Sequence, residues 1–289
     1  MPGTMIDFRA NGRTATGYLA RPTAPHGHGV LVVQEYWGLV DHIKDVADRF
    51  AAEGFVALAP DLYHGEKAKS PDDAGKLMMA LNIAETAKEL GGAADALIGR
   101  DDVTPKQVGI VGFCMGGQLA LIPAAMKLAD EILAGPSFEE TPEGVLAEEA
   151  RVVANAKKMF LQAAGGAVQK FREKLADEQE LIAALANIVM EIYAMESCLL
   201  RAQKAAAGKG QSATQTMIDA ARVFIAEAAE RVEHEARRAV TAVSEGDMLT
   251  TQMAVLKRFG KRAPVDTIAL RRGVAAAIQA QDRYPFEGR

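Results

Sequence analysis

The chain has 289 residues, of which 49% are hydrophobic, and its formal net charge at pH 7 is −5. This length accommodates one large domain or two ordinary ones, and the ordinary apolar share predicts a real hydrophobic core. Net negative charge without a basic run gives no electrostatic basis for binding nucleic acid or an anionic membrane surface. The unbroken apolar runs, such as residues 30–33, are far too short to span a bilayer.

Only two cysteines occur, Cys114 and Cys198. The start of the sequence, MPGTMIDFRA, has no apolar signal region. We therefore expect a cytoplasmic chain with free thiols. Cys198 stands among apolar neighbours and is expected to be an inert core residue.

The first half alternates extended and helical segments. An antiparallel pair, residues 5–8 and 14–20, surrounds the turn dipeptide Asn11-Gly12. The predicted elements that follow are a buried strand at 29–34, a helix at 41–53 capped by Asp41 and ended by Gly54, a strand at 55–59, a long helix from 70 towards 97, a break at Thr104-Pro105 and a strand at 108–111. Strands that alternate with helices predict a doubly wound parallel sheet, so the fold class of this half is α/β.

The segment VGIVGFCMGG, residues 108–117, organises the rest of this half. An apolar strand runs into Gly112, Cys114 and Gly116, after which GQLAL reads as a helix. This is the strand, sharp turn and helix of a nucleophile elbow, with cysteine at the position of the usual serine. Glycines flank the nucleophile because larger side chains would collide with the neighbouring strand and helix. The alternative interpretation is that Cys114 is a small buried hydrophobic residue.

From about residue 121 the sequence shows helical periodicity only. Helices are predicted at 122–133, 143–175, 178–206, 214–243, 248–258 and from Asp266 to about 280, with a break at Gly135-Pro136-Ser137 and a loop at 208–212. Single apolar stripes on consecutive helices predict a bundle. We therefore expect two domains, an α/β half-domain at 1–121 and an all-α domain at 122–289, with no sheet strand beyond the first ~120 residues.

The first half also resembles a known family. VLVVQEYWGLVDHIKDVADRFAAEGFVALAPDLYHG followed by VGIVGFCMGGQLAL resembles the dienelactone hydrolase family of the α/β-hydrolase superfamily, over about residues 1–121. The resemblance implies hydrolysis of a small ester or lactone without a cofactor or metal. It implies that Cys114 is the nucleophile, Glu35 its carboxylate partner at rest, and the backbone amides of Tyr36 and Met115 the oxyanion hole.

The family also uses an aspartate and a histidine that follow the elbow, and no later segment supplies them. His64 lies at the end of a predicted strand, but PDLYHG is a variant of a family loop that does not carry the catalytic histidine. His26 and His28 are expected at the opposite, amino end of the sheet. His234, between Glu233 and Glu235, could be a base or metal ligand, but a solvated helix face is the favoured interpretation.

The second half resembles the C-terminal helical extension of bacterial acyl-CoA dehydrogenases of the very-long-chain type, over about residues 119–289. The resemblance rests on GPSFEETPEGVLAEEARVVANAKKMFLQAAG, LADEQELIAALANIVMEIYAMESCLLRA and the terminal DRYPFEGR. It implies a part that makes dimer or membrane-side contacts and does no chemistry, and the flavin-binding core of that family is missing here. Within this half, Glu196 and Arg201 are predicted to form a polar pair.

Three functional hypotheses follow. The chain is a Cys114-dependent ester or lactone hydrolase, impaired because its triad aspartate and histidine are not found. Alternatively, it is a non-catalytic helical interaction module, or a chimera of two families with neither activity intact. An unpaired strand edge beside residues 108–111 would favour association, so we also expect the chain to self-associate or to pack its bundle against that edge.

Overall fold

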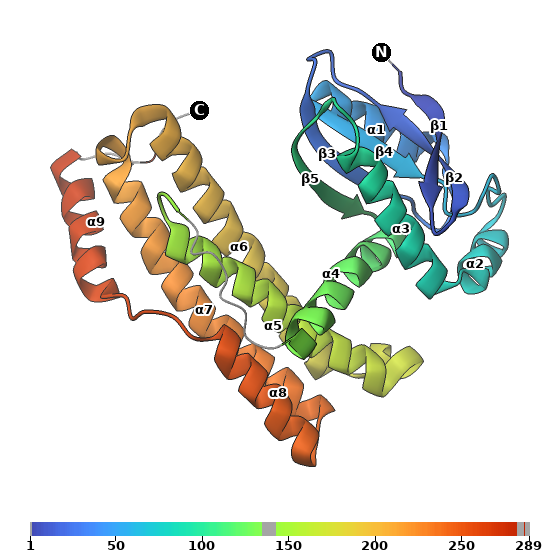
Figure 1. The fold of residues 1–289 in the computed structure, drawn as a ribbon. Helices are drawn as coiled ribbons and strands as arrows, with labels where there is room; N and C mark the ends of the chain where they lie inside the picture. Colours follow the sequence, from blue (N-terminus) through green and yellow to red (C-terminus); the bar gives the residue numbers. More distant parts are fainter. Residues whose placement is uncertain (1, 135–142, 282–285, 287–289) are drawn as a thin grey trace. The chain divides into compact units, whose positions relative to one another are not determined.

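The structure is a computed structural model that describes residues 2–134, 143–281 and 286. The chain divides into two compact units, Met1–Lys127 and Leu128–Arg289, which are called here the sheet unit and the helical unit (Figure 1). Helix α4 (Met115–Ala134) begins in the first unit and ends in the second.

The sheet unit contains a mixed sheet of five strands in the order β1-β2-β4-β3-β5. The strands are β1 (Thr4–Ala10), β2 (Arg13–Ala20), β3 (Gly27–Val33), β4 (Phe55–Pro60) and β5 (Val103–Gly112). The predicted hairpin is confirmed, because β1 pairs antiparallel with β2 and Asn11 and Gly12 both have positive φ, as a two-residue turn of this kind requires. Strand β2 also runs antiparallel to β4, and only β4, β3 and β5 are parallel.

Two helices cover opposite faces of the sheet, α1 (Asp41–Ala52) and α3 (Ile83–Ile98) (Figure 1). Strand β3 is buried on both faces, since Val30 and Val32 belong to the cluster with α1 and Leu31 to the cluster with α3. Its continuous apolar run reflects this double burial. The α/β architecture expected for the first half is therefore confirmed.

Helix α3 lies unusually close to the sheet at one point. A Cβ atom built on Gly92 would lie 2.5 Å from Ala10 Cβ and 2.6 Å from Ala10 Cα on β1. The preceding residue, Gly91, has open space at the same position. Glycine at 92 is thus what lets the helix backbone rest on the strand.

Three boundaries differ from those predicted from the sequence. Asp41 is the first residue of α1 and the capping position is Val40, without a side-chain cap. The predicted long helix is two helices, α2 (Pro71–Ala80) and α3, because the Asn82 side chain accepts a hydrogen bond from Glu85 N and starts a new helix. The break predicted at Thr104-Pro105 does not precede the strand. Pro105 lies within β5, in the irregular stretch where the pairing with β3 shifts register.

The helical unit is a bundle of long helices with two short 3₁₀ segments. They are α5 (Ala147–Phe171), η1 (Arg172–Asp177), α6 (Gln179–Lys209), η2 (Ser212–Thr214), α7 (Gln215–Val243), α8 (Gly246–Phe259) and α9 (Thr267–Gln281). Asp266 caps α9 by accepting from Ala269 N at 2.9 Å, as predicted. Residues 143–281 contain no strand, which confirms that the sheet is confined to the first unit. The predicted break at Gly135-Pro136-Ser137 lies outside the described residues, as does most of the terminal DRYPFEGR.

Helix α6 is, by length and hydropathy alone, long and apolar enough to cross a membrane. One of its faces nevertheless forms core of the bundle, because a stripe of its residues is buried there: Leu181, Ala184, Ile188, Ile192, Met195, Leu199, Ala202 and Ala206. The opposite face exposes the large apolar side chains Val189, Met190, Tyr193 and Leu200. The predicted pair of Glu196 and Arg201 is wrong, since Glu196 contacts Lys157 and Arg201 donates to the carbonyl of Phe286.

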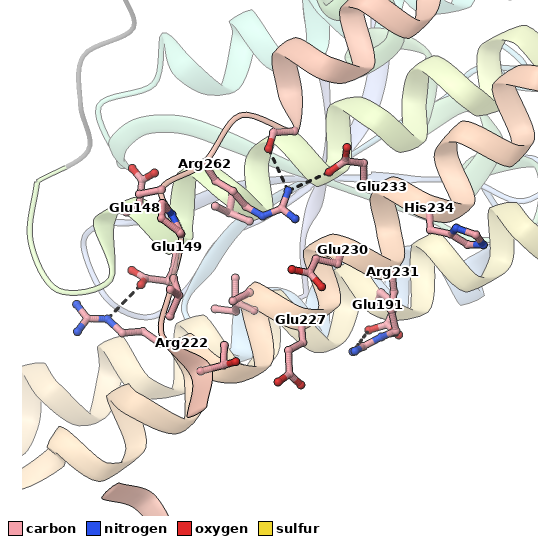
Figure 2. A pocket seen from close by; sticks show the side chains of 18 of the residues that line it. Glu148, Glu149, Glu191, Arg222, Glu227, Glu230, Arg231, Glu233, His234 and Arg262 are labelled. Carbon is pink, nitrogen blue, oxygen red and sulfur yellow. Dashed lines mark hydrogen bonds and ion pairs between the residues drawn. The ribbon is translucent and has the colours of Figure 1, made fainter. Parts of the chain in front are cut away.

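The helical unit also has a charged cavity of about 1010 Å³, lined by residues of α5, α6 and α7 and the segment after α8 (Figure 2). Its three arginines are all engaged: Arg222 with Glu149, Arg231 with Glu191, and Arg262 with Glu233. Pairing of this kind holds the helices in register and leaves no free cation in the part of the lining that the structure describes. We therefore interpret the cavity as structural.

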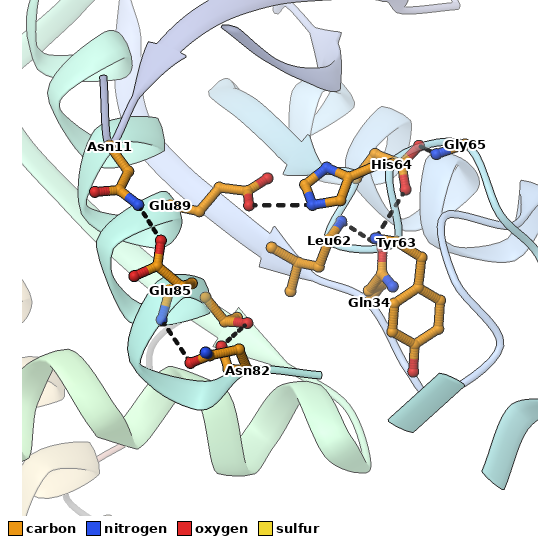
Figure 3. A network of polar contacts seen from close by, with 11 residues as sticks. Asn11, Gln34, Leu62, Tyr63, His64, Gly65, Asn82, Glu85 and Glu89 are labelled. Carbon is orange, nitrogen blue, oxygen red and sulfur yellow. Dashed lines mark hydrogen bonds and ion pairs between the residues drawn. The ribbon is translucent and has the colours of Figure 1, made fainter. Parts of the chain in front are cut away.

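A polar network holds the loop after β4 against α3 in the sheet unit (Figure 3). The buried Asp61 carboxylate accepts from the backbone amides of Tyr63 and Gly65, at 3.3 and 2.8 Å. His64 Nε2 lies 3.7 Å from Glu89 Oε2 on α3. Burial raises the pKa of the Glu89 carboxyl above its usual 4.5; His64 opposes this rise and Asp61 adds to it.

We predict that Gly92→Ala destabilises the sheet unit by about 2 kcal/mol, because the new methyl group collides with β1 backbone. The matched variant Gly91→Ala meets no neighbour and should gain up to about 1 kcal/mol of helix propensity. Trp37 is the single tryptophan and lies in the sheet unit, so its fluorescence during urea unfolding reports on this unit. Equal effects of the two variants would contradict the close approach of α3 to β1.

A second prediction concerns the raised pKa of Glu89. A carboxyl group whose pKa is raised by folding stabilises the fold most when it is protonated. This contribution is lost as the pH rises from 4.5, the usual pKa of the group, through its pKa in the folded chain. Glu89→Gln should therefore raise the urea midpoint at pH 8 and have little effect at pH 4. Lys88 lowers the pKa of Glu85 on the same helix, so Glu85→Gln should act in the opposite direction at pH 8. A lower midpoint for Glu89→Gln at pH 8 would show that its contact with His64 dominates.

Candidate functional site

The carboxyl ends of β3 and β5 lie side by side at one edge of the parallel part of the sheet. Val33 pairs with Gly112, the last residue of each strand. The chain after β3, which carries Glu35 and Tyr36, therefore meets the turn after β5, which carries Cys114 and Met115. Such carboxyl edges are where open α/β sheets place their sites.

The turn after β5 has the backbone of a nucleophile elbow. Cys114 has φ of +53°, in the left-handed region that side-chain-bearing residues rarely adopt. A conformation of this kind costs about 1–2 kcal/mol and persists only where the surroundings enforce it. Two hydrogen bonds close the turn, Gly116 N to Phe113 O at 2.8 Å and Gly117 N to Cys114 O at 3.1 Å.

The two glycines of the motif are required by backbone contacts. A Cβ on Gly112 would lie 2.0 Å from Gly116 O, and a Cβ on Gly116 would lie 2.4 Å from Val33 O and 2.5 Å from Gln34 O. These are contacts with backbone atoms, which cannot move aside as a flexible side chain can. The strand, the turn, the first turn of α4 and the end of β3 are thus packed backbone to backbone.

Cys114 is exposed and immediately precedes Met115, the first residue of α4. The thiol therefore stands at a helix N-terminus, where unpaired amides stabilise negative charge. The amides of Met115 and Tyr36 donate no backbone or side-chain hydrogen bond within the described residues. Both are available to a ligand atom.

Glu35 follows the buried Gln34 and is half-buried. Gln34 Oε1 accepts from Leu62 N at 3.2 Å, which ties the end of β3 to the loop after β4. Within the described residues, the Glu35 carboxylate makes no hydrogen bond or ion pair, and no hydrogen bond joins it to the Cys114 thiol. The structure thus brings the predicted residues to one edge without directly linking this pair.

Tyr63 was not singled out in the sequence and lies at this edge. Its hydroxyl group is 3.3 Å from the Tyr36 carbonyl oxygen and 3.3 Å from Met115 Sδ. Burial raises the pKa of Tyr63, and the nearby Cys114 thiol, when negative, raises it further. The sequence signal that could have found this residue is its position in PDLYHG, directly after the strand that pairs with β3.

The five histidines lie elsewhere or point elsewhere. His64 is at the carboxyl end of β4 but is directed to Glu89 on α3 (Figure 3). His28 pairs with Phe55 at the amino end of the sheet, as expected, and His26 precedes it. His42 is exposed on α1, and His234 is exposed on α7 as predicted, where it also lines the charged cavity of the helical unit. Within the described residues, no hydrogen bond joins Cys114 to a histidine.

Two family profiles match the sequence. The profile of the dienelactone hydrolase family matches residues 15–195, and that of the acyl-CoA dehydrogenase C-terminal domain matches residues 155–258. A putative carboxymethylenebutenolidase of Aquifex aeolicus is 40% identical over 147 residues, which are 49% of this chain and 63% of that protein. This chain thus spans less than two thirds of that hydrolase relative.

A second group of relatives is of a different kind. A probable acyl-CoA dehydrogenase of Bacillus subtilis is 34% identical over 168 residues, 58% of this chain and 28% of that protein. The crystal structure of an acyl-CoA dehydrogenase with FAD from Bacillus anthracis superposes with a TM-score of 0.55 and 29% identity, covering 73% of this chain and 33% of that one. Both expected resemblances are confirmed, and since the hydrolase profile extends over more than half of the residues, the chain belongs to the dienelactone hydrolase family.

Proposed function

We propose that this chain carries out thiol-dependent acyl transfer from small carboxylic esters or lactones, with Cys114 as the nucleophile. The observation that supports the proposal most is the left-handed backbone of Cys114 at a turn whose flanking glycines touch backbone. A cysteine that merely filled space would not need this conformation, and it would not be exposed. The left-handed, exposed position is what an attacking atom requires.

In the proposed reaction the Cys114 thiol loses its proton to solvent and the thiolate attacks the carbonyl carbon. A sulfur–carbon bond forms and the carbonyl electron pair moves onto oxygen, which receives hydrogen bonds from the amides of Tyr36 and Met115. The oxyanion electron pair then re-forms the carbonyl bond as the carbon–oxygen bond to the alcohol breaks. The alcohol oxygen leaves with the electron pair of that bond and takes up a proton from solvent, and a thioester remains on Cys114. Glu35, which directly precedes Tyr36 and is half-buried, is the proposed carboxylate partner of the thiol at rest.

Hydrolysis of the thioester is the slow half of the proposed reaction. Hydrolysis of a thioester needs a base that activates water. His64 is the one histidine at the carboxyl edge within the described residues, and it faces Glu89. We therefore propose that acylation is faster than deacylation, and that turnover is impaired relative to a hydrolase with a complete triad.

A second role is proposed for the helical unit, as an interaction module that brings two copies of the chain together. It is supported by the exposed apolar side chains on α6, Met190, Tyr193 and Leu200, of which Tyr193 is 75% exposed. Single exposed apolar residues are ordinary on a protein surface, whereas several large apolar side chains on one helix face are typical of an interaction site. This role does not depend on the chemistry of Cys114.

The proposed nucleophile predicts that iodoacetamide modifies Cys114 faster than Cys198. Cys114 is exposed, whereas Cys198 is half-buried and burial raises the pKa of its thiol. Peptide mass spectrometry of the alkylated chain measures both rates in one sample. With p-nitrophenyl acetate, we expect a burst of p-nitrophenolate of one equivalent per chain and a single acetyl group on Cys114.

Two single-thiol variants serve as controls. Cys198→Ala should keep the burst and Cys114→Ala should abolish it. A burst that survives in Cys114→Ala, or a Cys114 that reacts no faster than Cys198, would falsify the proposed nucleophile. Steady turnover at the burst rate would instead reveal an efficient base, and His64→Ala would test whether that base is His64.

The proposed interaction role predicts that the chain sediments as a dimer or larger species. Tyr193→Glu places a charge on the exposed face of α6 and should shift the population towards the monomer, because burying an unpaired charge is costly. Val168→Glu on α5 is a matched control at another exposed apolar position and should not change the sedimentation coefficient. A monomeric wild-type chain at all concentrations would rule this role out.

A further inference from the structure

The Tyr63 side chain stands between the two backbone segments that carry the free amides of the elbow. Its hydroxyl contacts Tyr36, from the segment after β3, and Met115, from the start of α4. Tyr63 itself comes from a third segment, the loop after β4. One phenol thus touches the Tyr36 carbonyl oxygen and the Met115 side chain, in the two residues whose amides form the proposed oxyanion hole.

The phenol is held firmly in this place. Tyr63 is 6% exposed and packs in one apolar cluster with Val33, Leu62, Leu90, Met115 and Leu119, and Tyr36 packs against that cluster. A Cβ on Gly38 would lie 3.2 Å from Tyr63 Cδ2, so the chain after β3 closes over the ring. The Tyr63 backbone amide is fixed in turn by the Asp61 carboxylate.

We infer that Tyr63 is a positioning residue that sets the separation of the Tyr36 and Met115 amides. This inference rests on the proposed acyl transfer at Cys114. In it, Tyr63 affects the reaction through Tyr36 and Met115 and does not itself contact the reacting atoms. The hydroxyl has one proton and donates it to the Tyr36 carbonyl oxygen, the stronger acceptor, while the Met115 sulfur is held in contact.

The physical reason is the geometry that an oxyanion requires. Two amides stabilise the developing charge only when both lie within hydrogen-bond distance of the same oxygen. Tyr36 belongs to a short irregular segment between β3 and α1 that lacks sheet hydrogen bonds at this residue. Tyr63 ties that segment to the fixed first turn of α4, whose position the Gly116 contacts determine.

Tyr63→Phe tests this role, because it removes the hydroxyl and keeps the ring in its cluster. Acylation of Cys114 by p-nitrophenyl acetate develops an oxyanion, whereas alkylation by iodoacetamide does not. We expect the acylation rate constant at saturating ester to fall about tenfold, less than the loss of an entire oxyanion donor. The alkylation rate of Cys114 should stay within about twofold, since attack on a saturated carbon needs no oxyanion hole.

Tyr18→Phe is the matched control. Tyr18 on β2 is also a buried tyrosine of the sheet unit, and its hydroxyl donates to the carboxylate of Asp48 on α1 at 2.9 Å. It should leave both rates unchanged, although it removes a buried hydrogen bond in the same way. A split between acylation and alkylation in Tyr63→Phe alone is the result that the inference predicts.

Each other outcome contradicts it. If both rates fall together in Tyr63→Phe, the hydroxyl merely supports the elbow fold and does not position the amides. If neither falls, the contact has no part in the chemistry. If Cys114 of the wild-type chain takes up no acetyl group while it is still alkylated, the proposed acyl transfer itself is wrong, and the role of Tyr63 is overturned with it.

Discussion

The close contact of backbone with backbone around Gly116 is the constraint on which the rest of the sheet unit depends. The first turn of α4 rests on the carbonyl groups of Val33 and Gln34, and Gly112 rests on Gly116. These contacts leave the chain no room to pass Cys114 in an ordinary helical or extended conformation, so the cysteine adopts positive φ. The thiol is consequently exposed, whereas Met115, directly after it, is buried in the apolar cluster with Tyr63.

The surroundings of this turn are arranged around the same contact. Leu62 and Tyr63 come from the neighbouring strand end, Gln34 links them to β3, and Met115 and Leu119 close the cluster from α4. On the other side, β5 forms the edge of the sheet, and Ile110 is 38% exposed there. The nucleophile turn of the sheet unit thus follows directly on the edge strand. The hydrolase relative from Aquifex aeolicus matches this chain over 63% of its own length, whereas residues 155–258 of the helical unit match the acyl-CoA dehydrogenase C-terminal domain.

Much of the fold could be predicted from the sequence, because local patterns determine it. The turn at Asn11-Gly12, the double-sided burial of β3, the elbow glycines and the helical periodicity after residue 121 are all properties of short segments. The break between α2 and α3 was missed because Asn82 interrupts an apolar periodicity that continues on both sides of it. The place of Tyr63 and the contact of Glu89 with His64 could not be predicted. They join segments that are far apart in the sequence and that come together only in the folded sheet.

A crystal structure of the chain after reaction with p-nitrophenyl acetate tests the proposed nucleophile and oxyanion hole most directly. We predict a thioester on Cys114, with φ of this residue still positive and the acyl oxygen within hydrogen-bond distance of both the Tyr36 and the Met115 amide. An unmodified Cys114 in an ordinary helical or extended conformation would contradict the elbow. A thioester whose oxygen points to solvent, away from the two amides, would contradict the proposed oxyanion hole.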